Sequence, residues 1–475
     1  MAEVKKQEKD YSKEVDAILP EARSLAEASK LQEALDKLFA LEKQTRNASD
    51  LSSTTRLVKE ISQLNYDARD YELLNTGIQT LSKKHGQLKV AIQEMVEQAI
   101  GWLEEIKARD GQEKWLQLIE TLRTVTEGKL FLETPRARVT LLLSKYHESL
   151  IKSPTQTDPT TKDCLQTASD LLNDLQVETY SSMERREKTE FILEQMRLLI
   201  ALARVKDSEK PAGDKKDIMG GGEGEWVKVR VGGRKVNEGF LAEKANEDLK
   251  LKYYNMMIEY ALNQSEYLDA AKYYYKIWET ASIKEDENGR GREALEHIVY
   301  YIVLAPHDNE QSDMLHRLHN DPALLRLDLQ YALVKCFTTQ ELMRWPGIEQ
   351  IYGPNLRQTD VFTSDKLWED LHIRVIEHNI RIVAKYYTRI TLPRLTTLLD
   401  LTPEQAEETL ARLVVSGTIW ARVDRPTGVV NFRGGKSAED VMNDWSSDMQ
   451  RLLSLVEKTW MGVNAAQAAQ SRVKA

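Results

Sequence analysis

The stretch TLLDLTPEQAEETLARLVVSGTIWARVDRPTGVVNF (397–432) predicts a short helix, a second helix and then a β-hairpin. Thr402 followed by Pro403 is a helix start, because the threonine hydroxyl can accept from a free amide of the first turn and proline fits its first position. Gly417 is suited to end that helix. The segment RPTG (425–428) is compatible with a turn between TIWARVD and GVVNF. This order of elements predicts a winged helix.

Many winged helices read DNA, so the charge of the second helix decides between two uses of the module. A DNA-reading helix presents basic and amide side chains to the major groove. Here the outward side carries Glu404, Gln405, Glu407 and Glu408, with Arg412 as its lone cation. Glutamates repel phosphates. We therefore expect a protein contact and no specific nucleic-acid binding, with a nucleic-acid-binding winged helix as the less favoured alternative.

The chain before this module is predominantly helical. Apolar residues recur at steps of three and four through segments such as AIQEMVEQAIGWLEEI (91–106), which is typical of amphipathic helices. Short polar breaks separate these segments, and no strand alternation appears. The fold class expected is mainly α: a solenoid of tetratricopeptide-like helix pairs, followed by a winged-helix module with a small β-hairpin and a C-terminal helix.

Changes in composition suggest five segments along the chain. A helical-repeat solenoid is expected over 1–205. A Gly-rich, charged insertion follows at 206–245, and its EWVKVRVGG (225–233) alternates apolar and charged residues as a short extended segment would. Further helices are expected over 246–372, the winged helix over 373–434, and a terminal helix with a tail over 435–475.

The terminal segment AEDVMNDWSSDMQRLLSLVEKTWMGV (438–463) predicts a helix with a broad apolar stripe. The residues of the stripe are Val441, Trp445, Met449, Leu452, Val456 and Trp460. A helix this apolar must bury its face against another surface. The pattern leaves two options open, packing back on the chain's own solenoid or joining helices of other subunits in a bundle, and we favour the bundle.

The overall composition indicates a soluble protein with real cores. The 475 residues carry a net charge of −9 and are 41% hydrophobic, and an acidic balance argues against broad phosphate binding. Cys164 and Cys336 cannot build a disulfide framework or a zinc site, which suits a reducing compartment. No secretory signal and no membrane-spanning run is found. We expect a protein of the cytoplasm and nucleus that does not contact membranes.

No pattern in the sequence predicts catalysis, a metal or a cofactor. The loop GGKS (434–437) lacks the preceding glycine of a phosphate-binding loop, since Val430 occupies that position. His316 and His319 lie three residues apart but have no third zinc ligand near them. No nucleophile motif or dinucleotide fingerprint occurs. We therefore predict a protein that is not an enzyme.

A helical array that leads into a non-basic winged helix and a terminal helix resembles the PCI-domain proteins. This family takes its name from the proteasome lid, the signalosome and a translation initiation factor. The resemblance is to proteasome-lid members and is strongest over 249–432. It rests on LLNDLQVETYSSMERREKTEFILEQMRL (171–198), YIVLAPHDNEQSDMLHRLHND (301–321), KCFTTQELMRWPGIEQIYG (335–353) and RVIEHNIRIVAKYYTRITLPRLTTLLDLTPEQAE (374–407). The insertion at 206–224 departs from the family.

The resemblance implies a non-catalytic scaffold of the proteasome lid in ubiquitin-dependent degradation. Its partners would be the other PCI subunits and the deubiquitinase of the lid, with the N-terminal solenoid touching the base ATPases and the core particle. Winged-helix edges of neighbouring subunits would pair side by side. The residues implied for that edge are Thr418, Ile419, Trp420, Val429, Val430 and Phe432. The terminal stripe would join a helical bundle. A signalosome scaffold is the main alternative.

Overall fold

The computed structural model describes residues 10–28, 30–151, 159–208, 222–286, 289–432 and 438–474. Gly220 and Gly221 of the predicted insertion and the loop 434–437 lie outside these ranges. The chain divides into two compact units, Met1–Gln264 and Ser265–Ala475, which are described separately below. The segment limits inferred from composition stay predictions.

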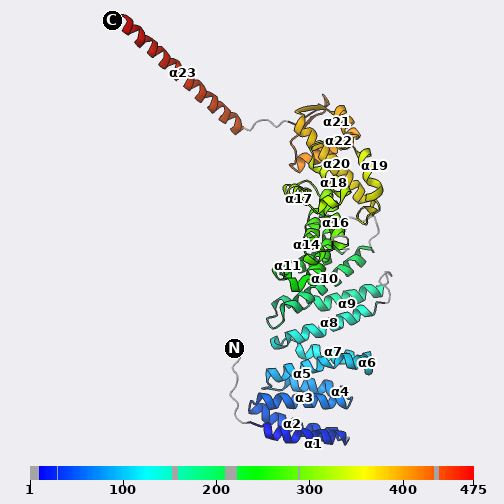
Figure 1. The fold of residues 1–475 in the computed structure, drawn as a ribbon. Helices are drawn as coiled ribbons and strands as arrows, with labels where there is room; N and C mark the ends of the chain where they lie inside the picture. The colour runs from blue at the N-terminus through cyan, green and yellow to red at the C-terminus, as the bar shows by residue number, and fades with distance from the viewer. Residues whose placement is uncertain are drawn as a thin grey trace. The chain divides into compact units, whose positions relative to one another are not determined.

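The first unit is a stack of helices in which each packs on its neighbours in the chain (Figure 1). Its α-helices are α1 Ser12–Glu27, α2 Leu31–Asn47, α3 Leu51–Asp67, α4 Tyr71–Lys83, α5 Lys89–Gly101, α6 Leu103–Arg109, α7 Gln112–Thr126, α8 Glu133–Ser149, α9 Pro159–Asn173, α10 Arg185–Ser208, α11 Glu223–Lys235, α12 Glu238–Leu241 and α13 Glu247–Asn263. Its 3-10 turns are η1 Leu130–Leu132, η2 Val177–Thr179 and η3 Lys244–Asn246.

One turn recurs between neighbouring helices of this unit. Ser49 lies in the connection between α2 and α3, and Arg69 lies in the connection between α3 and α4. Their φ values are 55° and 58°. Each left-handed residue is followed by an aspartate, Asp50 or Asp70, whose carboxylate accepts from a first-turn amide of the next helix. A positive φ reverses the chain at once, and the aspartate satisfies an amide that would otherwise lack a partner. Two short turns therefore set successive helices side by side.

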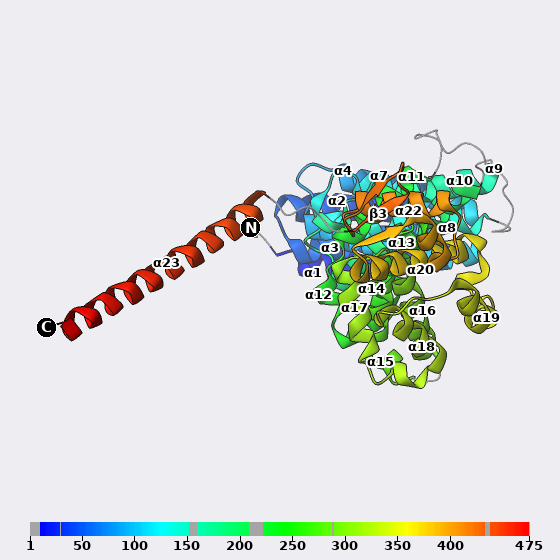
Figure 2. The same ribbon diagram turned by 90° about the horizontal axis from the view of Figure 1, so that it is seen from above.

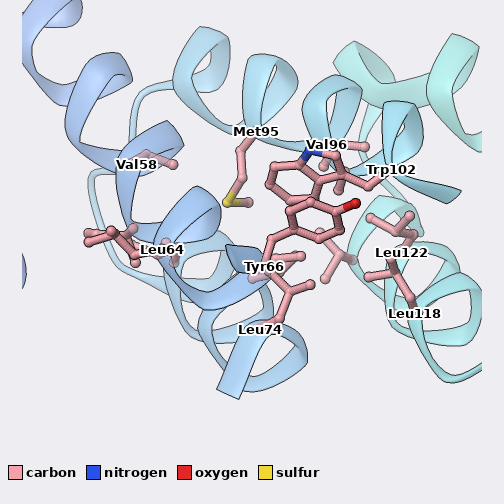
Figure 3. Packing of buried hydrophobic residues seen from close by; sticks show 14 of the residues in the cluster. Val58, Leu64, Tyr66, Leu74, Met95, Val96, Trp102, Leu118 and Leu122 are labelled. Atoms are coloured by element: carbon pink, nitrogen blue, oxygen red, sulfur yellow. The ribbon is translucent and has the colours of Figure 1, made fainter. Parts of the chain in front are cut away.

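The core of this unit is continuous from α1 to α8. Near its centre the rings of Tyr66 and Trp102 stack at 4.5 Å, and Met95 and Leu74 lie close to the pair (Figure 3). The Tyr66 hydroxyl donates to the Glu105 carboxylate at 2.7 Å. Burial, together with this bond, raises the pKa of Tyr66 to about 12. The large aromatic residues of the sequence are thus packing material here.

The extended segment predicted around Trp226 is wrong, because these residues form the helix α11. Trp226 and Val229, three residues apart, are buried at 3% and 0% exposure. Gly232 and Gly233 follow, and a Cβ on them would lie 2.9 Å from Met196 Cγ and 2.8 Å from Met257 Sδ. Glycine lets α11 approach α10 and α13 this closely, and that packing overrides the poor helix propensity of the segment.

Asp207, at the end of α10, also fixes the start of α11. Its Oδ1 accepts from the Gly222 amide at 3.1 Å, and its Oδ2 accepts from Trp226 Nε1 at 2.8 Å. Lys206 pairs with Glu225 at 2.8 Å. The two ends of the segment 209–221 are therefore held next to each other.

The second unit contains further helices and a small sheet. Its α-helices are α14 Tyr267–Trp278, α15 Ala281–Lys284, α16 Arg290–Leu304, α17 Asn309–His319, α18 Asp328–Thr338, α19 Trp345–Leu356, α20 Asp365–Tyr386, α21 Leu392–Leu399, α22 Pro403–Val415 and α23 Ala438–Lys474. Its 3-10 turns are η4 Leu324–Arg326 and η5 Val361–Thr363, and its strands are β1 Arg389–Thr391, β2 Arg422–Asp424 and β3 Val429–Asn431.

The predicted winged helix is present over α20, α21, α22 and the sheet. Its core joins the stripe of α20 to the inner faces of α21 and α22 and to the sheet. Its buried members are Ile376, Ile380, Val383, Ile390, Leu395, Leu399, Leu410, Leu413, Val430 and Phe432. Thr402 forms a full capping box with Gln405 at the start of α22, and Gly417, with φ of 74°, follows its end. The expected order of helix, helix and hairpin is confirmed.

The hairpin prediction missed a third strand. The helix α20 ends at Tyr386, and Arg389–Thr391 then forms β1, which pairs with β3 antiparallel through Ile390 and Val430. The strand order is β1-β3-β2. Because β3 has a neighbour on each side, it is the centre of the sheet.

Candidate protein-interaction surfaces

The central position of β3 corrects part of the predicted edge. Val429 and Val430 lie on β3, which bonds to both β1 and β2, and Val430 is 0% exposed. Phe432 is buried at 8% exposure in the core. A strand paired on both sides has no free backbone groups to offer a partner. The backbone of Val429 and Val430 is therefore not at the sheet edge, and Phe432 supports the sheet from the core.

The other half of the predicted edge is at the surface. β2 pairs with β3 alone among the described residues, so its second side is unpaired in the part of the chain that the structure covers. Trp420 leads into β2 and is 49% exposed. Thr418 and Ile419 are half-buried, and both their amides donate to the Leu413 carbonyl at the end of α22. The end of α22 thus fixes the start of the edge segment.

Three exposed apolar residues that the predicted edge does not include lie in the same module. Val415, the last residue of α22, is 88% exposed, and Tyr386 and Tyr387, ahead of β1, are 64% and 41% exposed. Exposed apolar groups on one small module mark interaction sites. Val415 and Tyr386 are apolar residues at the very ends of α22 and α20, and that position was the available signal.

Two cations of the winged helix, Arg412 and Arg425, are already paired with carboxylates. Arg412 Nη2 lies 3.2 Å from Glu377 Oε1, and Arg425 Nε donates to Glu407 Oε1 at 2.7 Å. Glu404 and Glu408 are exposed on α22. At α22 a phosphate would meet the exposed Glu404 and Glu408, while the charges of Arg412 and Arg425 are already balanced by carboxylates. This arrangement is unfavourable for binding nucleic acid.

The terminal helix α23 exposes its whole apolar stripe. It is one unbroken helix of 37 residues (Figures 1 and 2), and every residue of 438–468 is exposed. The exposed fractions of the stripe are 52% for Val441, 61% for Trp445, 43% for Met449, 59% for Leu452, 56% for Val456 and 66% for Trp460. Two exposed tryptophans on a single helix give it an apolar surface of the kind that protein contacts cover.

The described residues contain no group of three or more His, Cys, Asp or Glu side chains placed to hold a metal ion. Cys164 and Cys336 are both free thiols and half-buried. Over the same residues, no helix combines the length and the apolar character that a membrane crossing needs.

Three family models match successive parts of the chain. The model described as PSMD12/CSN4, N-terminal, matches residues 33–286, and the PCI domain matches 331–433, which ends at the sheet of the winged helix. The C-terminal domain of 26S proteasome regulatory subunit RPN5 matches 439–460, entirely within α23.

Curated relatives extend the match to nearly the whole chain. The 26S proteasome regulatory subunit RPN5 of Saccharomyces cerevisiae is 40% identical over 458 residues, which cover 95% of this chain and 94% of the relative. The chain belongs to the RPN5/PSMD12 family of 26S proteasome regulatory subunits. The 26S proteasome non-ATPase regulatory subunit 12 of Dictyostelium discoideum is 37% identical, with 96% and 94% covered. Homolog A of Arabidopsis thaliana is 35% identical, with 92% and 96% covered.

The RPN5/PSMD12 family confirms the resemblance to PCI-domain proteins and the predicted fold class. The order of the matches follows that of the structural elements, with helices first, then the winged helix, then α23. The model of the C-terminal domain contains Trp445, Met449 and Leu452, so the exposed stripe is part of a family-defined domain. None of these matches assigns a contact to a particular residue.

Proposed function

We propose that this chain is a non-catalytic scaffold subunit of the 26S proteasome regulatory particle lid, serving ubiquitin-dependent protein degradation. The observation that carries the proposal is the match of 35–40% identity over 92–96% of the chain to relatives named as 26S proteasome regulatory subunits. The described residues add exposed apolar surfaces to this argument.

The winged helix supplies the first assembly surface in this proposal. Thr418, Ile419 and Trp420 lead into β2, whose second side has no partner strand among the described residues, so a strand of a neighbouring PCI subunit can add there. Val415 extends the surface with an apolar contact. Val429, Val430 and Phe432 keep β2 in place from within the sheet and core.

The helix α23 supplies the second surface. Its six-residue stripe from Val441 to Trp460 repeats at helical spacing and is exposed throughout. Leu453 and Leu455, 62% and 66% exposed, widen it beyond a narrow two-helix seam. A wide apolar face fits a bundle of several helices better than a single partner helix.

The partners proposed are the other PCI subunits and the deubiquitinase of the lid. The N-terminal solenoid would contact the base ATPases and the core particle. A subunit with these partners acts in the cytoplasm and the nucleus. A signalosome scaffold is the second candidate, and the match of residues 439–460 to the RPN5 C-terminal domain favours the proteasome.

Affinity capture tests the proposal directly. The tagged chain, recovered gently from its own cells, should carry lid, base and core proteasome subunits in near-equal amounts by quantitative mass spectrometry. Signalosome subunits in their place would transfer the function to that complex. Recovery of nucleic acid alone, released at raised salt, would overturn the scaffold proposal.

A substitution in α23 tests the role of the stripe. Trp445→Asp should leave the isolated chain folded, because Trp445 is 61% exposed, yet should abolish incorporation into the complex. Ser454→Asp adds the same charge on the opposite side of the helix and should assemble normally. Normal assembly of the Trp445→Asp variant would refute the bundle.

A further inference from the structure

A slot of about 550 Å³ opens between α8, α10 and α13 in the first unit. It shares no residue with the winged helix or with α23, so it is separate from both surfaces proposed above. Its volume lies within the range of about 300–1,000 Å³ that is usual for ligand pockets. Its apolar lining includes Leu141, Met183, Phe191, Leu249 and Met256.

Two ion pairs connect α8 to α10, one towards each end of the slot. Arg138 Nε donates to Glu187 Oε1 at 2.6 Å, and Arg197 Nη2 donates to Glu148 Oε2 at 2.7 Å. Both helices advance by ten residues from the first pair to the second. The two helices therefore run in the same direction, and residues at equal distances from these pairs lie at the same level of the slot.

The helix α13 runs in the same direction and forms the third wall. Asp248, at its start, pairs with Arg186 near the start of α10 at 3.0 Å. Glu259, near its end, pairs with Arg204 near the end of α10 at 2.8 Å. The lining residues of α13 therefore follow the same order along the slot: Leu249, Lys252, Asn255 and Met256.

One half of the slot is apolar. Leu141 lies one turn after Arg138 on α8, and Phe191 lies one turn after Glu187 on α10. Leu249 belongs to the first turn of α13. Leu141 is half-buried, and Phe191 and Leu249 are 2% and 1% exposed. These three side chains give the half nearest the Arg138–Glu187 pair a surface on which an apolar group can be buried.

The other half carries two lysines. Lys145 on α8 and Lys252 on α13 are exposed, and neither pairs with a carboxylate among the described residues. Glu194 on α10 lies near both of them. Its pKa is lowered first by the hydrogen bond from Arg197, and the charges of the two lysines lower it further. Arg197 is itself shared between Glu194 and Glu148. Three cations against two carboxylates leave one positive charge, which one carboxylate of a ligand would balance.

The other acids of the lining are already engaged. Glu187 accepts from Arg138 through both of its oxygens, at 2.6 and 3.0 Å. Glu190 accepts from Arg186 at 3.1 Å. Among the described lining residues, the two lysines are thus the charged groups without a partner, and this favours a negatively charged ligand.

The spacing of the two halves matches an extended peptide. Leu141 and Lys145 are four residues apart on α8, which corresponds to a rise of about 6 Å. In an extended chain, side chains two residues apart point to the same side and are separated by about 6.6 Å. Asn255, exposed on the α13 wall, has both a donor and an acceptor for the backbone of such a chain.

We propose that this slot binds an extended segment of a partner protein in which a large apolar side chain and an Asp or Glu stand two residues apart. The apolar side chain packs on Leu141, Phe191 and Leu249. The carboxylate lies between Lys145 and Lys252 and balances the excess positive charge. Binding at this site does not depend on assembly of the chain into the lid.

Methyl NMR of the full chain tests the proposal, because Met183 and Met256 line the slot. The chain, labelled with [13C-methyl]methionine, is titrated with a peptide that carries Leu-Ser-Glu-Ser-Leu between Gly-Ser ends. This sequence places a leucine two residues from the glutamate on either side, so the direction of the bound chain does not matter.

The signals of Met183 and Met256, assigned with Met183→Leu and Met256→Leu, should shift saturably with this peptide. Those of Met95 and Met343, which are buried elsewhere, should stay in place. Unchanged Met183 and Met256 signals up to the solubility limit of the peptide would overturn the proposal.

Control ligands define the occupant. The peptide Ser-Ser-Glu-Ser-Ser lacks the apolar side chains, and octanoate lacks the backbone, so both should bind more weakly than the Leu-Ser-Glu-Ser-Leu peptide. Octanoate binding of equal strength would assign the slot to a small apolar acid. Shifts of the same two signals on dilution of the protein alone would assign it to a second copy. Either result would overturn the proposed partner.

Charge variants locate the carboxylate of the peptide. Lys145→Gln and Lys252→Gln should each weaken binding of Leu-Ser-Glu-Ser-Leu by about threefold. Neither change should affect the neutral peptide Leu-Ser-Gln-Ser-Leu. Lys228→Gln, at an exposed position of α11 outside the lining, is the matched control and should change nothing. Equal weakening for both peptides, or in Lys228→Gln, would refute the contact between the lysines and the carboxylate.

A truncation locates the apolar side chain. Leu141→Ala should weaken binding of both leucine peptides by about fivefold, because it removes part of the surface that covers the leucine. Leu150→Ala, at a position just after α8 that is 44% exposed and outside the lining, should leave binding unchanged. Circular dichroism checks that both variants are folded. Equal affinities of the folded Leu141→Ala variant and the wild type would contradict the apolar contact.

Discussion

Two long helices of the second unit, α20 and α23, carry the same kind of apolar stripe and differ in where it lies. In α20, Ile380 and Val383 are 0% and 1% exposed and join the core of the winged helix. In α23, Trp445 and Leu452 are 61% and 59% exposed. Helical periodicity therefore predicts that the apolar face of a helix must be covered. It does not predict whether the same chain or another molecule covers that face. The stability of the chain should depend on the first stripe and its assembly on the second.

Matched truncations in the two stripes should separate these roles most strongly. Ile380→Ala should lower the free energy of unfolding by about 2–5 kcal/mol, because it removes a fully buried side chain and leaves a cavity. Leu452→Ala should leave it nearly unchanged in the isolated chain. Urea denaturation followed by circular dichroism measures both. A similar loss in the two variants would mean that α23 packs within the isolated chain.

A pH series should sharpen the comparison through His378, a buried polar residue of α20. Its lowered pKa means that the unfolded chain binds a proton below about pH 6.5 that the folded chain does not take up until the pH approaches 4. The contribution of His378 to the free energy of unfolding should therefore be fully present above pH 6.5. It should fall by about 2 kcal/mol on acidification to about pH 5.

Urea titrations of the wild type and of His378→Gln at both pH values check this contribution. The variant should lose less stability on acidification than the wild type. The exposed His316→Gln serves as a control and should follow the wild type. An equal loss in the wild type and His378→Gln would contradict the linkage.

The smallest effect expected within the winged helix concerns the start of α22. Thr402→Ala removes the hydroxyl that accepts from the Gln405 amide and should cost about 1 kcal/mol in thermal or urea unfolding. Thr397→Ala, at an exposed position inside α21, should cost clearly less. If both changes proved equal, the capping box would not be what defines this helix start.

The parts of the fold that could be predicted are those determined by local chemistry. The Thr402–Pro403 start and Gly417 beyond the end of α22 follow from amide satisfaction and backbone freedom, and both are present. The stripes of α20 and α23 likewise follow from spacing alone. Such signals lie within a few residues of the element they define.

The parts that were missed depend on distant contacts. β1 exists because Ile390 pairs with Val430, which lies 40 residues later in the chain. The same pairing places β3, which carries Val429 and Val430 of the predicted edge, at the centre of the sheet. α11 forms because two glycines let it approach Met196 and Met257, which no local propensity records. A pocket that Lys385 helps to line is formed by residues of α17, α18 and α20 and of the segments next to them. Because these residues are far apart in the chain, no sequence motif marks it.

The two hydrogen bonds that the Asp207 carboxylate accepts have a consequence for how this chain can vary and be modified. Asp207 binds Gly222 and Trp226 directly, so the chain re-enters the fold at the point where it left. The stretch between these anchors can then change in length at little cost, since each doubling of a closed loop adds about 0.6 kcal/mol. The range 209–221 is accordingly a suitable insertion site. A labelling site, a purification tag or a whole reporter domain can be inserted there while α10 and α11 keep their contact.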